Sequence, residues 1–415
     1  MVARAKTLSA DEAFLKRLFR SYYEKWNEKP PKDFEKREFA FMMTKEGEMV
    51  RHKSFSEWSE VKEFLRRNAP LHVFYSSAYY LNPDAPDMDS KEWLGADLIF
   101  DIDVDHIPTP CKEKHDTWTC LNCGFAGRGM PPEECPNCSS KRIEVKTWFC
   151  DECLLVAKEE AMKLIEDFLI ADFGFSTSEI TVAFSGRRGF HVHVESDVVK
   201  ELDQRARREI VDYVKGVGLA IAEGRGRVLI PPLTAPGWFG RVSRGVYEIL
   251  SGRSIDELAS SLGLKATKKF REGVELLTSS LERAEDFQAL PSGLRKMWKV
   301  LVDKAVQEKR CEVDERVTTD IKRLIRMPGS LHGGSGLIVT KLSVKELETF
   351  DPLRQAVAFK KGYVKVRVHE MPEIRFLDDV WGPFRNEVVE IPAGLAVYLI
   401  CSGNATIVKG GVRAC

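Results

Sequence analysis

Apolar and acidic side chains alternate in the segment LIFDIDVDH, residues 98–106. In an extended strand, successive side chains point to opposite faces of the sheet. The pattern therefore predicts a strand that carries Asp101, Asp103 and Asp105 on one face and the intervening apolar residues on the other. One face of this strand should be buried, and the other should be acidic.

The rest of the chain shows the periodicities of both helices and strands. Residues from about 9 to 28 have apolar side chains at helical spacing, and Ser9 and Glu12 can form a capping box at the start of that helix. Strand-like segments follow at REFAFMM, HVFYSSAYYL, DLIFDIDV, ITVAFSG and FHVHV. Strands interleaved with helical patterns indicate an α/β or α+β fold.

Amphipathic, charge-rich helical patterns fill the middle of the chain, and strand and turn signals resume at CEVDERV. This change predicts an inserted, mainly helical subdomain. The domain boundaries that we expect are 1–110 and 154–196 for the first part of a main body, 111–153 for a cysteine-rich segment, 197–305 for the helical subdomain, and 306–415 for the second part of the body.

Composition indicates an ordinary folded protein of 415 residues, with 43% hydrophobic and 30% charged residues. Its 63 basic and 63 acidic residues cancel, so a polyanion would have to bind a local patch. The N-terminus lacks a signal-peptide pattern, and the longest apolar stretch, AGLAVYLICSG, is too short to span a bilayer. We therefore expect a cytoplasmic protein, in which CxxC pairs are more often metal ligands than disulfides.

The cysteine-rich segment offers eight metal ligands, namely Cys111, His115, Cys120, Cys123, Cys135, Cys138, Cys150 and Cys153. Three CxxC pairs with one further Cys and one His fill two tetrahedral Zn²⁺ sites and leave no position open for water, so both ions should be structural. The four inner cysteines resemble a zinc ribbon, and the outer four ligands would close the base of the loop. A cross-braced pairing of the same ligands is also possible.

The acidic pair in FDID suits divalent metal ions. Carboxylates at i and i+2 of a strand lie about 6.5–7 Å apart at Cα, and both can reach a pair of ions about 3.5–4 Å apart. The alternative is a half-buried strand with a solvated acidic face. No basic residue lies between the acids, and their mutual repulsion favours a cation.

The segment FSGRRGFHVHV, residues 184–194, combines a tight glycine turn with Arg187 and Arg188. Free backbone N–H groups beside forked guanidinium groups suit a phosphate chain, although a surface hairpin with solvated arginines is the alternative. His191 and His193 share one face of the following strand.

The segment VDERVTTDIKRLIRMPGSLHGGSGL, residues 313–337, places several charged residues around a helix and a glycine-rich turn, namely Asp314, Lys322, Arg323, Arg326 and His332. Asp320 is explained as an acid in the first turn of the helix, where it offsets the helix dipole. Asp314 lies in a strand-like stretch before the helix and is therefore the better candidate for a third metal ligand.

Together these segments resemble the small catalytic subunit of the archaeal and eukaryotic type of DNA primase. REFAF and RHKSF are similar to the family's early strands, FDID to its metal-binding pair, and FSGRRGFHVHV to its nucleotide-binding hairpin. The matches run in order over about residues 14–405, and IPAGLAVYLICSGNA is similar to a late family segment. The outer ligand set resembles the family's zinc site. The inner loop, roughly residues 116–148, departs from the family pattern and could extend a template or partner contact or be a stable decoration.

The resemblance implies roles for individual residues. It implies that Asp101, Asp103 and Asp314 bind two Mg²⁺ or Mn²⁺ ions, which activate a 3′-hydroxyl and bind the incoming triphosphate so that pyrophosphate is released. It also implies a set of nucleotide contacts, namely Ser185, Arg187, Arg188, His191, Arg326 and His332. Lys322 and Arg323 are plausible helpers, and Asp105 lies outside the family pattern.

The implied fold is a primase-type α+β catalytic core, with an antiparallel sheet carrying the acids beside an α/β unit and the active site in the cleft between them. The implied activity is template-directed synthesis of short RNA or DNA primers for replication. Its implied partners are a large subunit with an iron–sulfur cluster in a heterodimer, a single-stranded DNA template, and NTPs or dNTPs, with no membrane involved. The close match of the motifs favours an archaeal source.

Two other functions are compatible with parts of this pattern. A repair or gap-filling polymerase of the same superfamily would extend existing ends without starting new ones. A non-catalytic zinc-ribbon protein would bind nucleic acid through the cysteine segment, although the presence of all three acids disfavours a decayed active site.

Overall fold

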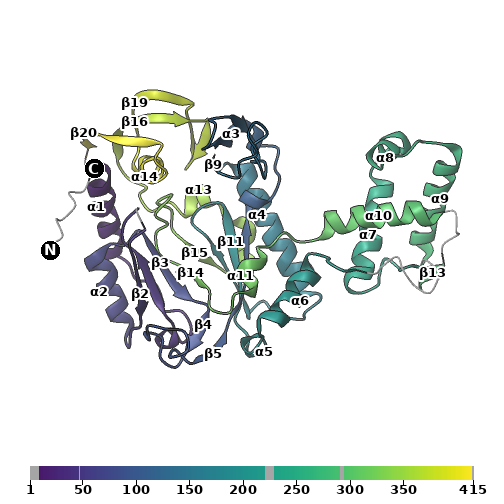
Figure 1. Cartoon of the computed structure of the whole chain (residues 1–415), viewed down its shortest axis with the longest axis horizontal. Coiled ribbons are helices and arrows are strands. Elements are labelled where there is room, and N and C mark those ends of the chain that lie inside the picture. The colour runs from purple at the N-terminus through teal and green to yellow at the C-terminus, as the bar shows by residue number, and fades with distance from the viewer. Residues whose placement is uncertain (1–8, 46, 220–228, 290–293, 414–415) are drawn as a thin grey trace. The chain divides into compact units, whose positions relative to one another are not determined.

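The structure is a computed structural model that describes residues 9–45, 47–219, 229–289 and 294–413 (Figure 1). The fold is a mixed α+β structure in which every strand pair between described strands is antiparallel. The chain forms two compact units, the first comprising Met1–Met162, Thr177–Arg207 and Val313–Cys415, and the second comprising Lys163–Ser176 and Arg208–Glu312. The domain boundaries expected from the sequence stay a prediction.

The first unit contains two four-stranded sheets. One sheet has the order β14(Leu324–Arg326), β3(His72–Ser76), β1(Phe39–Met42), β2(Met49–Lys53). The other has the order β15(Thr340–Leu342), β10(Ile180–Phe184), β11(Gly189–Val194), β6(Leu98–Asp103). We call the first the arginine sheet, because it carries Arg326, and the second the acid sheet, because it carries Asp101 and Asp103.

The remaining strands form smaller sheets. Two of them have three strands each, with the orders β8(Ala126–Arg128), β7(Thr117–Cys120), β9(Ile143–Lys146) and β19(Phe384–Pro392), β16(Tyr363–Met371), β20(Ala405–Arg413). The two-stranded pairs are β4(Ala78–Tyr80) with β5(Trp93–Ala96), β17(Ile374–Phe376) with β18(Asp379–Trp381), and β12(Leu229–Ile230) with β13(Gln288–Ala289).

The helices of the first unit are mostly short. They are α1(Ala10–Glu24), α2(Trp58–Asn68), α3(Lys112–His115), α4(Asp151–Lys163), α5(Asp197–Lys200), α11(Glu315–Thr319), α12(Val344–Thr349), α13(Pro352–Gln355) and α14(Ala393–Cys401), with the 3₁₀ turns η1(Phe34–Lys36) and η2(Val104–His106). The predicted capping box at the start of α1 is confirmed, since Ser9 and Glu12 each accept a hydrogen bond from the other's backbone N–H. Figure 1 shows α1 and α2 alongside the arginine sheet.

The acid sheet has the two faces that the alternating pattern predicts. Phe100 and Ile102 of β6 and Phe190 and Val192 of β11 are fully buried on one face. On the other face, Asp101 lies opposite His191 in the strand register, and Asp103 lies opposite Gly189. The buried face anchors the strand, so the acids are presented from a rigid element.

The prediction that Asp105 shares this strand face is wrong. The strand β6 ends at Asp103, and residues Val104–His106 form the 3₁₀ turn η2. The side chain of Asp103 accepts a hydrogen bond of 2.9 Å from the backbone N–H of Asp105, and this local bond competes with continuation of the strand. Asp105 therefore lies beyond the end of the strand that carries the other two acids.

The second unit is mainly helical. It contains the π-helical segment η3(Leu164–Ile170) and helices α7(Gly237–Ser251), α8(Ile255–Ser261), α9(Lys268–Arg283) and α10(Arg295–Lys309), while α6(Gln204–Val214) begins just before the boundary between the units. Its core includes Trp298 and Leu301 of α10 and Val242 and Val246 of α7, all of which are nearly or fully buried. None of the described helices in either unit is both long and apolar enough to cross a membrane.

Candidate active site and metal centres

The three predicted acids come together at the end of β6. Asp314 is the N-cap residue of α11, and its backbone N–H donates a hydrogen bond of 2.9 Å to the carbonyl oxygen of Asp101. The prediction that Asp320 lies in the first turn of this helix is wrong, because the helix begins after Asp314 and Asp320 is its C-cap. The side chain of Asp314 accepts from the backbone N–H of Arg316 at 2.8 Å. The structure thus attaches the start of α11 directly to the acid strand, although the two segments are far apart in the sequence.

Burial and mutual repulsion perturb the acid on the strand. Burial, the neighbouring charge of Asp103 and the charge of Asp314 raise the pKa of Asp101 to about 7. Arg326 and Arg323 act in the opposite direction on the same pKa. An acid whose ionised form is this unfavourable is a candidate functional group, because a bound cation would relieve the repulsion.

His191 lies on β11, the strand next to the acids, and Arg326 acts on them from β14 of the arginine sheet. Burial lowers the pKa of Arg326, although the charges of Asp101 and Asp103 oppose that change. The Nε2 atom of His191 lies 3.6 Å from Oδ1 of Asp101. Burial, with the nearby charge of Arg326, holds the pKa of His191 well below its ordinary value, so this imidazole is neutral, with one nitrogen that donates a hydrogen bond and one that accepts.

The glycine turn between β10 and β11 is built by close packing. The backbone N–H of Ser185 donates to the carbonyl of Gly189 at 2.9 Å and closes the turn. Gly186 has a φ of +83°, and a Cβ at this position would lie 2.6 Å from Cβ of His332. Only glycine fits this position, and the close approach brings His332 to the predicted phosphate-binding turn.

His332 is also fixed from the other side. Its Nδ1 accepts a hydrogen bond of 3.1 Å from the backbone N–H of Gly334, and its ring meets the ring of His72 edge to face at 4.8 Å between centroids. Burial and the charge of Arg326 hold the pKa of His332 well below its ordinary value. The structure therefore brings His191 and Arg326 to the acids, and Ser185 and His332 to the glycine turn beside them.

The two adjacent arginines of the turn have different surroundings. Arg187 donates to the hydroxyl of Thr147 at 2.7 Å and lines a cavity of about 340 Å³ that Lys146 and Ser402 also line. Arg188 is only 1% exposed, and its guanidinium pairs with Asp116 and Asp105 at 3.0 and 2.9 Å. Arg188 also lines this cavity, but its guanidinium already has two carboxylate partners, whereas Arg187 is available to a ligand there.

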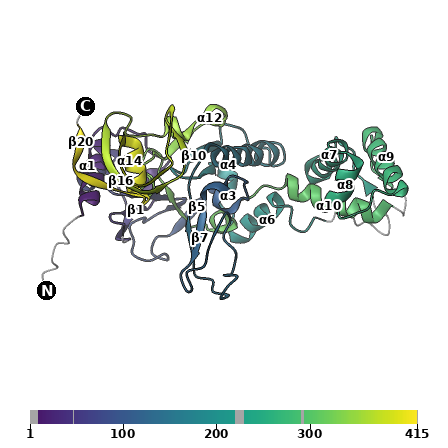
Figure 2. The same ribbon diagram turned by 90° about the horizontal axis from the view of Figure 1, so that it is seen from above.

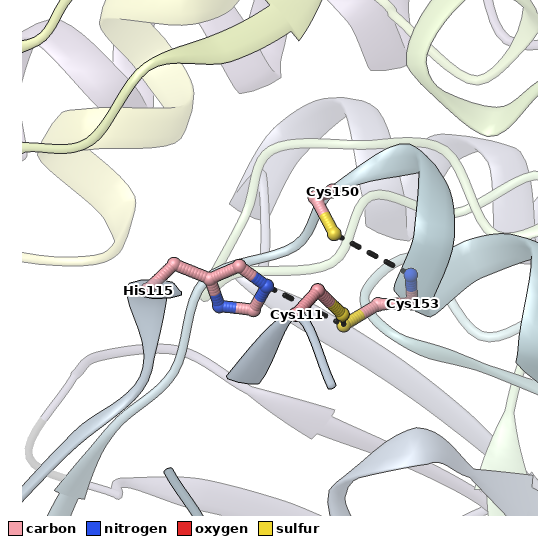
Figure 3. A group of neighbouring side chains, drawn as sticks. All are labelled: Cys111, His115, Cys150 and Cys153. Atoms are coloured by element: carbon pink, nitrogen blue, oxygen red, sulfur yellow. Dashed lines mark hydrogen bonds between the residues drawn. The ribbon is translucent and has the colours of Figure 1, made fainter. Parts of the chain in front are cut away.

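The outer ligand set forms one group at the junction of α3 and α4, as Figure 3 shows. The Sγ atoms of Cys111 and Cys153 lie 3.2 Å apart, and Sγ of Cys153 lies 3.6 Å from Nε2 of His115. Cys150 lies one turn before Cys153, and its sulfur accepts from the Cys153 backbone N–H at 3.4 Å. Because Nδ1 of His115 contacts Asp116 at 2.8 Å, Nε2 is left facing the thiols. Three thiols and one imidazole nitrogen so arranged are a fitting donor set for Zn²⁺.

The inner ligand set forms a second group on the sheet of β7, β8 and β9. Sγ of Cys120 lies 3.6 Å from that of Cys138, and Cys123 lies at the same distance from Cys135. Among the described residues, the four ligand atoms within each of these two groups lie within 4.8 Å of one another. The nested pairing is therefore the one found, and the cross-braced alternative is not. Figure 2 shows β7 and its loops extending away from the rest of the first unit.

Two acidic residues beside these sites were missed as contributors in the analysis of the sequence. Asp116 contacts both His115 and Arg188, and Asp105 contacts Arg188 and Asp103. A signal for Asp116 was available, because it directly follows a predicted metal-ligating histidine, and carboxylates commonly orient such histidines. For Asp105 the alternating pattern gave the wrong face, so its partner could not be inferred.

Comparison with known proteins gives a consistent result. Residues 142–344 match the family described as DNA primase small subunit. The chain is 33% identical to the DNA primase small subunit PriS of Methanothrix thermoacetophila, over 96% of this chain and 99% of the relative. It is 34% identical to the proteins of the same name from Methanococcoides burtonii and Thermoplasma volcanium, over 94% and 95% of this chain and 97% of each relative.

Proposed function

Since the chain belongs to the DNA primase small subunit family, we propose that it is the catalytic subunit of a DNA primase and makes primers on single-stranded DNA by nucleotidyl transfer. The observation that carries this proposal is the attachment of Asp314 to Asp101 beside Asp103, with His191 3.6 Å from Asp101 and the charges of Arg326 and Arg323 acting on it. Neither the repair-polymerase function nor the non-catalytic function is favoured by the names of the relatives.

Asp101, Asp103 and Asp314 would hold two Mg²⁺ or Mn²⁺ ions. Carboxylate oxygens suit these hard cations. The raised pKa of Asp101 supports the assignment, because burial and the nearby charges of Asp103 and Asp314 disfavour its ionised form, and a cation would offset that penalty. Such ions supply Lewis acidity at the attacking 3′-hydroxyl and at the leaving pyrophosphate. The residues themselves present the oxygens from the end of a buried strand and from the N-terminus of α11.

Four side chains around the acids would bind the triphosphate and orient it. Arg187 and Arg326 supply fixed positive charge, and the neutral imidazoles of His191 and His332 supply hydrogen bonds without adding charge. Ser185 begins the glycine turn, whose backbone N–H groups would bind phosphate oxygens. Lys322 and Arg323 would be helpers, and Arg323 is the better supported, because its charge acts on the pKa of Asp101.

The two cysteine groups would each hold one structural Zn²⁺ ion. Each provides four donor atoms and leaves no position for a water ligand, so neither would take part in the chemical step. The outer group closes the base of the loop, and the inner group would stabilise the small sheet of β7, β8 and β9.

The partners would follow from the family. A large primase subunit would form a heterodimer with this chain and contribute an iron–sulfur cluster, a single-stranded DNA would be the template, and NTPs or dNTPs would be the substrates. The residues 1–110, 154–196 and 306–415 would form the catalytic core, with the zinc segment 111–153 and the helical subdomain 197–305 inserted into it.

The test is primer synthesis on unprimed single-stranded DNA with Mn²⁺ or Mg²⁺, with and without the large subunit. The double variant Asp101→Asn/Asp103→Asn should lose at least about 100-fold in rate, because it removes charge from the metal-binding acids. The control is Asp256→Asn, which removes an exposed acid of α8 in the second unit and should keep the wild-type rate. Extension of a primed template without any product from an unprimed one would support a repair polymerase instead.

A further inference from the structure

A continuous chain of polar contacts joins the outer cysteine group to the acid strand. Nδ1 of His115 lies 2.8 Å from Oδ1 of Asp116, and Oδ2 of Asp116 lies 3.0 and 3.1 Å from the two terminal nitrogens of Arg188. One of these nitrogens lies 2.9 Å from Oδ1 of Asp105. The backbone N–H of Asp105 donates to the side chain of Asp103 at 2.9 Å. The path therefore ends on a proposed ligand of the catalytic ions.

Lys112 forms a second connection between the same two regions. It lies in α3, next to Cys111, and its side chain is only 1% exposed. Its ammonium donates to the carbonyl oxygens of Val104 and Ile107, the second at 2.7 Å, and contacts that of Asp105 at 3.3 Å. Val104 and Asp105 belong to the 3₁₀ turn that directly follows Asp103, and Ile107 is the C-cap of that turn. Lys112, in the helix that ends at the ligand His115, therefore holds the turn in place.

The strand end is also held tightly by its neighbour. The backbone N–H of Val104 donates to the carbonyl of Arg188 at 3.3 Å. A Cβ on Gly189 would lie 2.1 Å from the carbonyl oxygen of Ile102, so the two backbones approach too closely for any larger residue. A shift of the turn at Arg188 would therefore be transmitted to the residues that present Asp103.

We infer that Lys112, Asp116 and Arg188 are positioning residues, and that they make the affinity of the acid strand for divalent ions depend on the state of the outer cysteine group. This inference rests on the proposed function, because it assigns a role to residues beside the proposed catalytic acids. Four ligands fixed by Zn²⁺ hold α3 and His115 in place, and Lys112 and the Asp116–Arg188 pair transfer that order to the turn after Asp103. Arg188 then acts through Asp103 and does not need to touch the nucleotide.

For the same substitution, the loss of charge and the loss of positioning predict changes of opposite sign in the affinity for a divalent ion. Arg188→Gln and Lys112→Met each remove a positive charge near the acids, so electrostatics alone would make a divalent ion bind more tightly. Loss of positioning would make it bind more weakly. The sign of the change in ion affinity therefore separates the two effects.

The experiment is a titration of the full chain with Mn²⁺, without nucleotide or DNA, in which electron paramagnetic resonance measures the free ion. We expect Arg188→Gln and Lys112→Met to weaken Mn²⁺ binding by about 10-fold, the scale on which residues behind a metal ligand act. Arg187→Gln is the matched control, because it removes the adjacent charge without touching the path, and its Mn²⁺ affinity should be unchanged or increased. Zinc content and melting temperature of each variant establish that the fold and both zinc ions are retained.

Arg188→Lys keeps the charge but cannot bridge two carboxylates as the forked guanidinium does. This variant replaces Arg188→Gln in the test if Arg188→Gln does not fold. It too should bind Mn²⁺ more weakly than the wild type. Unchanged or tighter Mn²⁺ binding in the Arg188 variants, with a raised KM for nucleotide, would overturn the inference and make Arg188 a phosphate contact. Asp101→Asn separates the two proposals: if it binds Mn²⁺ as the wild type does, the catalytic metal site itself is wrong.

Discussion

The two cysteine groups have nearly the same ligands but very different surroundings. In the outer group Cys111 and Cys153 are buried, and Asp116, which follows the ligand His115 in the sequence, is paired with Arg188. In the inner group Cys120 and Cys135 are also buried, but Cys123 is exposed, and the segment around it leaves Leu121 and Phe125 open to solvent. The comparison teaches that the consequence of losing a zinc ion is set less by the ligands than by what those ligands and their neighbours contact.

The packing around the outer group explains why its loss should spread. Phe149, just before Cys150, lies 4.3 Å from the ring of Tyr398 between centroids, and Trp148 lies 6.2 Å from the same ring. Tyr398 belongs to α14, every residue of which is buried. Disorder at the outer group would therefore reach the core, whereas disorder at the inner group would reach only β7, β8 and β9.

The largest effect should come from Cys153→Ser. Cys153 is fully buried at the start of α4, and its loss should remove one zinc ion and lower the free energy of unfolding by about 4 kcal/mol or more, since metal loss is among the most destabilising changes. Denaturant unfolding and metal analysis on the same preparation measure both quantities. An equal decrease in the free energy of unfolding for Cys123→Ser of the inner group would contradict the difference between the two groups.

A smaller effect of opposite sign should come from Asp101→Asn in the metal-free protein. The pKa of Asp101 is about 7 in the fold and 3.8 ordinarily, so the folded state binds its proton more tightly, and stability falls as pH rises from about 4 to about 7. The amide removes this loss, and we expect the variant to be more stable than the wild type at pH 8 by up to about 4 kcal/mol, the value of a shift of about three pKa units. Near pH 4 the difference should disappear.

Melting curves at the two pH values check this prediction. Added Mn²⁺ should stabilise the wild type but not the variant, because the ion offsets the repulsion between acids only where the carboxylate is present. Equal stability of the two proteins at both pH values would show that neither burial nor the neighbouring acids disfavour the ionised form of Asp101 in the fold. A substitution in the acid strand is thus expected to change the stability of the protein in the opposite direction to one in the outer cysteine group, and by a smaller amount.

The smallest effect should come from Cys123→Ser. This variant should lose one zinc ion yet change the global free energy of unfolding by less than about 1 kcal/mol, because the exposed small sheet can lose order locally. Hydrogen exchange should increase at β7, β8 and β9 and stay unchanged at β6 and β11. Faster exchange at β6 would show that the inner group also supports the acid strand.

The rate of zinc release sharpens the same comparison. With a colorimetric chelator, the wild type should release its two ions in two phases, the inner one first, because exposed ligands are open to attack by the chelator. Cys123→Ser should show only the slow phase. A single phase for the wild type would mean that the two groups are equally protected.

Much of the site could be predicted from local patterns. The alternation in LIFDID placed Asp101 and Asp103 on one strand face, and the three CxxC pairs identified the thiol ligands, because both patterns depend on spacing within a few residues. The same local reasoning failed at Asp105, where one hydrogen bond from its backbone to Asp103 ends the strand. The pattern of apolar residues carries no information on where such a bond forms.

The sequence by itself determined the chemistry of the ligands, the acidic strand and the glycine turn, since these depend on residue type and short spacing. The tertiary structure alone decided three things: that the cysteine groups are nested, that Asp314 is hydrogen-bonded to Asp101, and that Arg188 pairs with Asp116 and Asp105. Each of these joins segments that only packing brings together. Two adjacent arginines look alike in the sequence, and only burial and the position of carboxylates from distant segments distinguish Arg187 from Arg188.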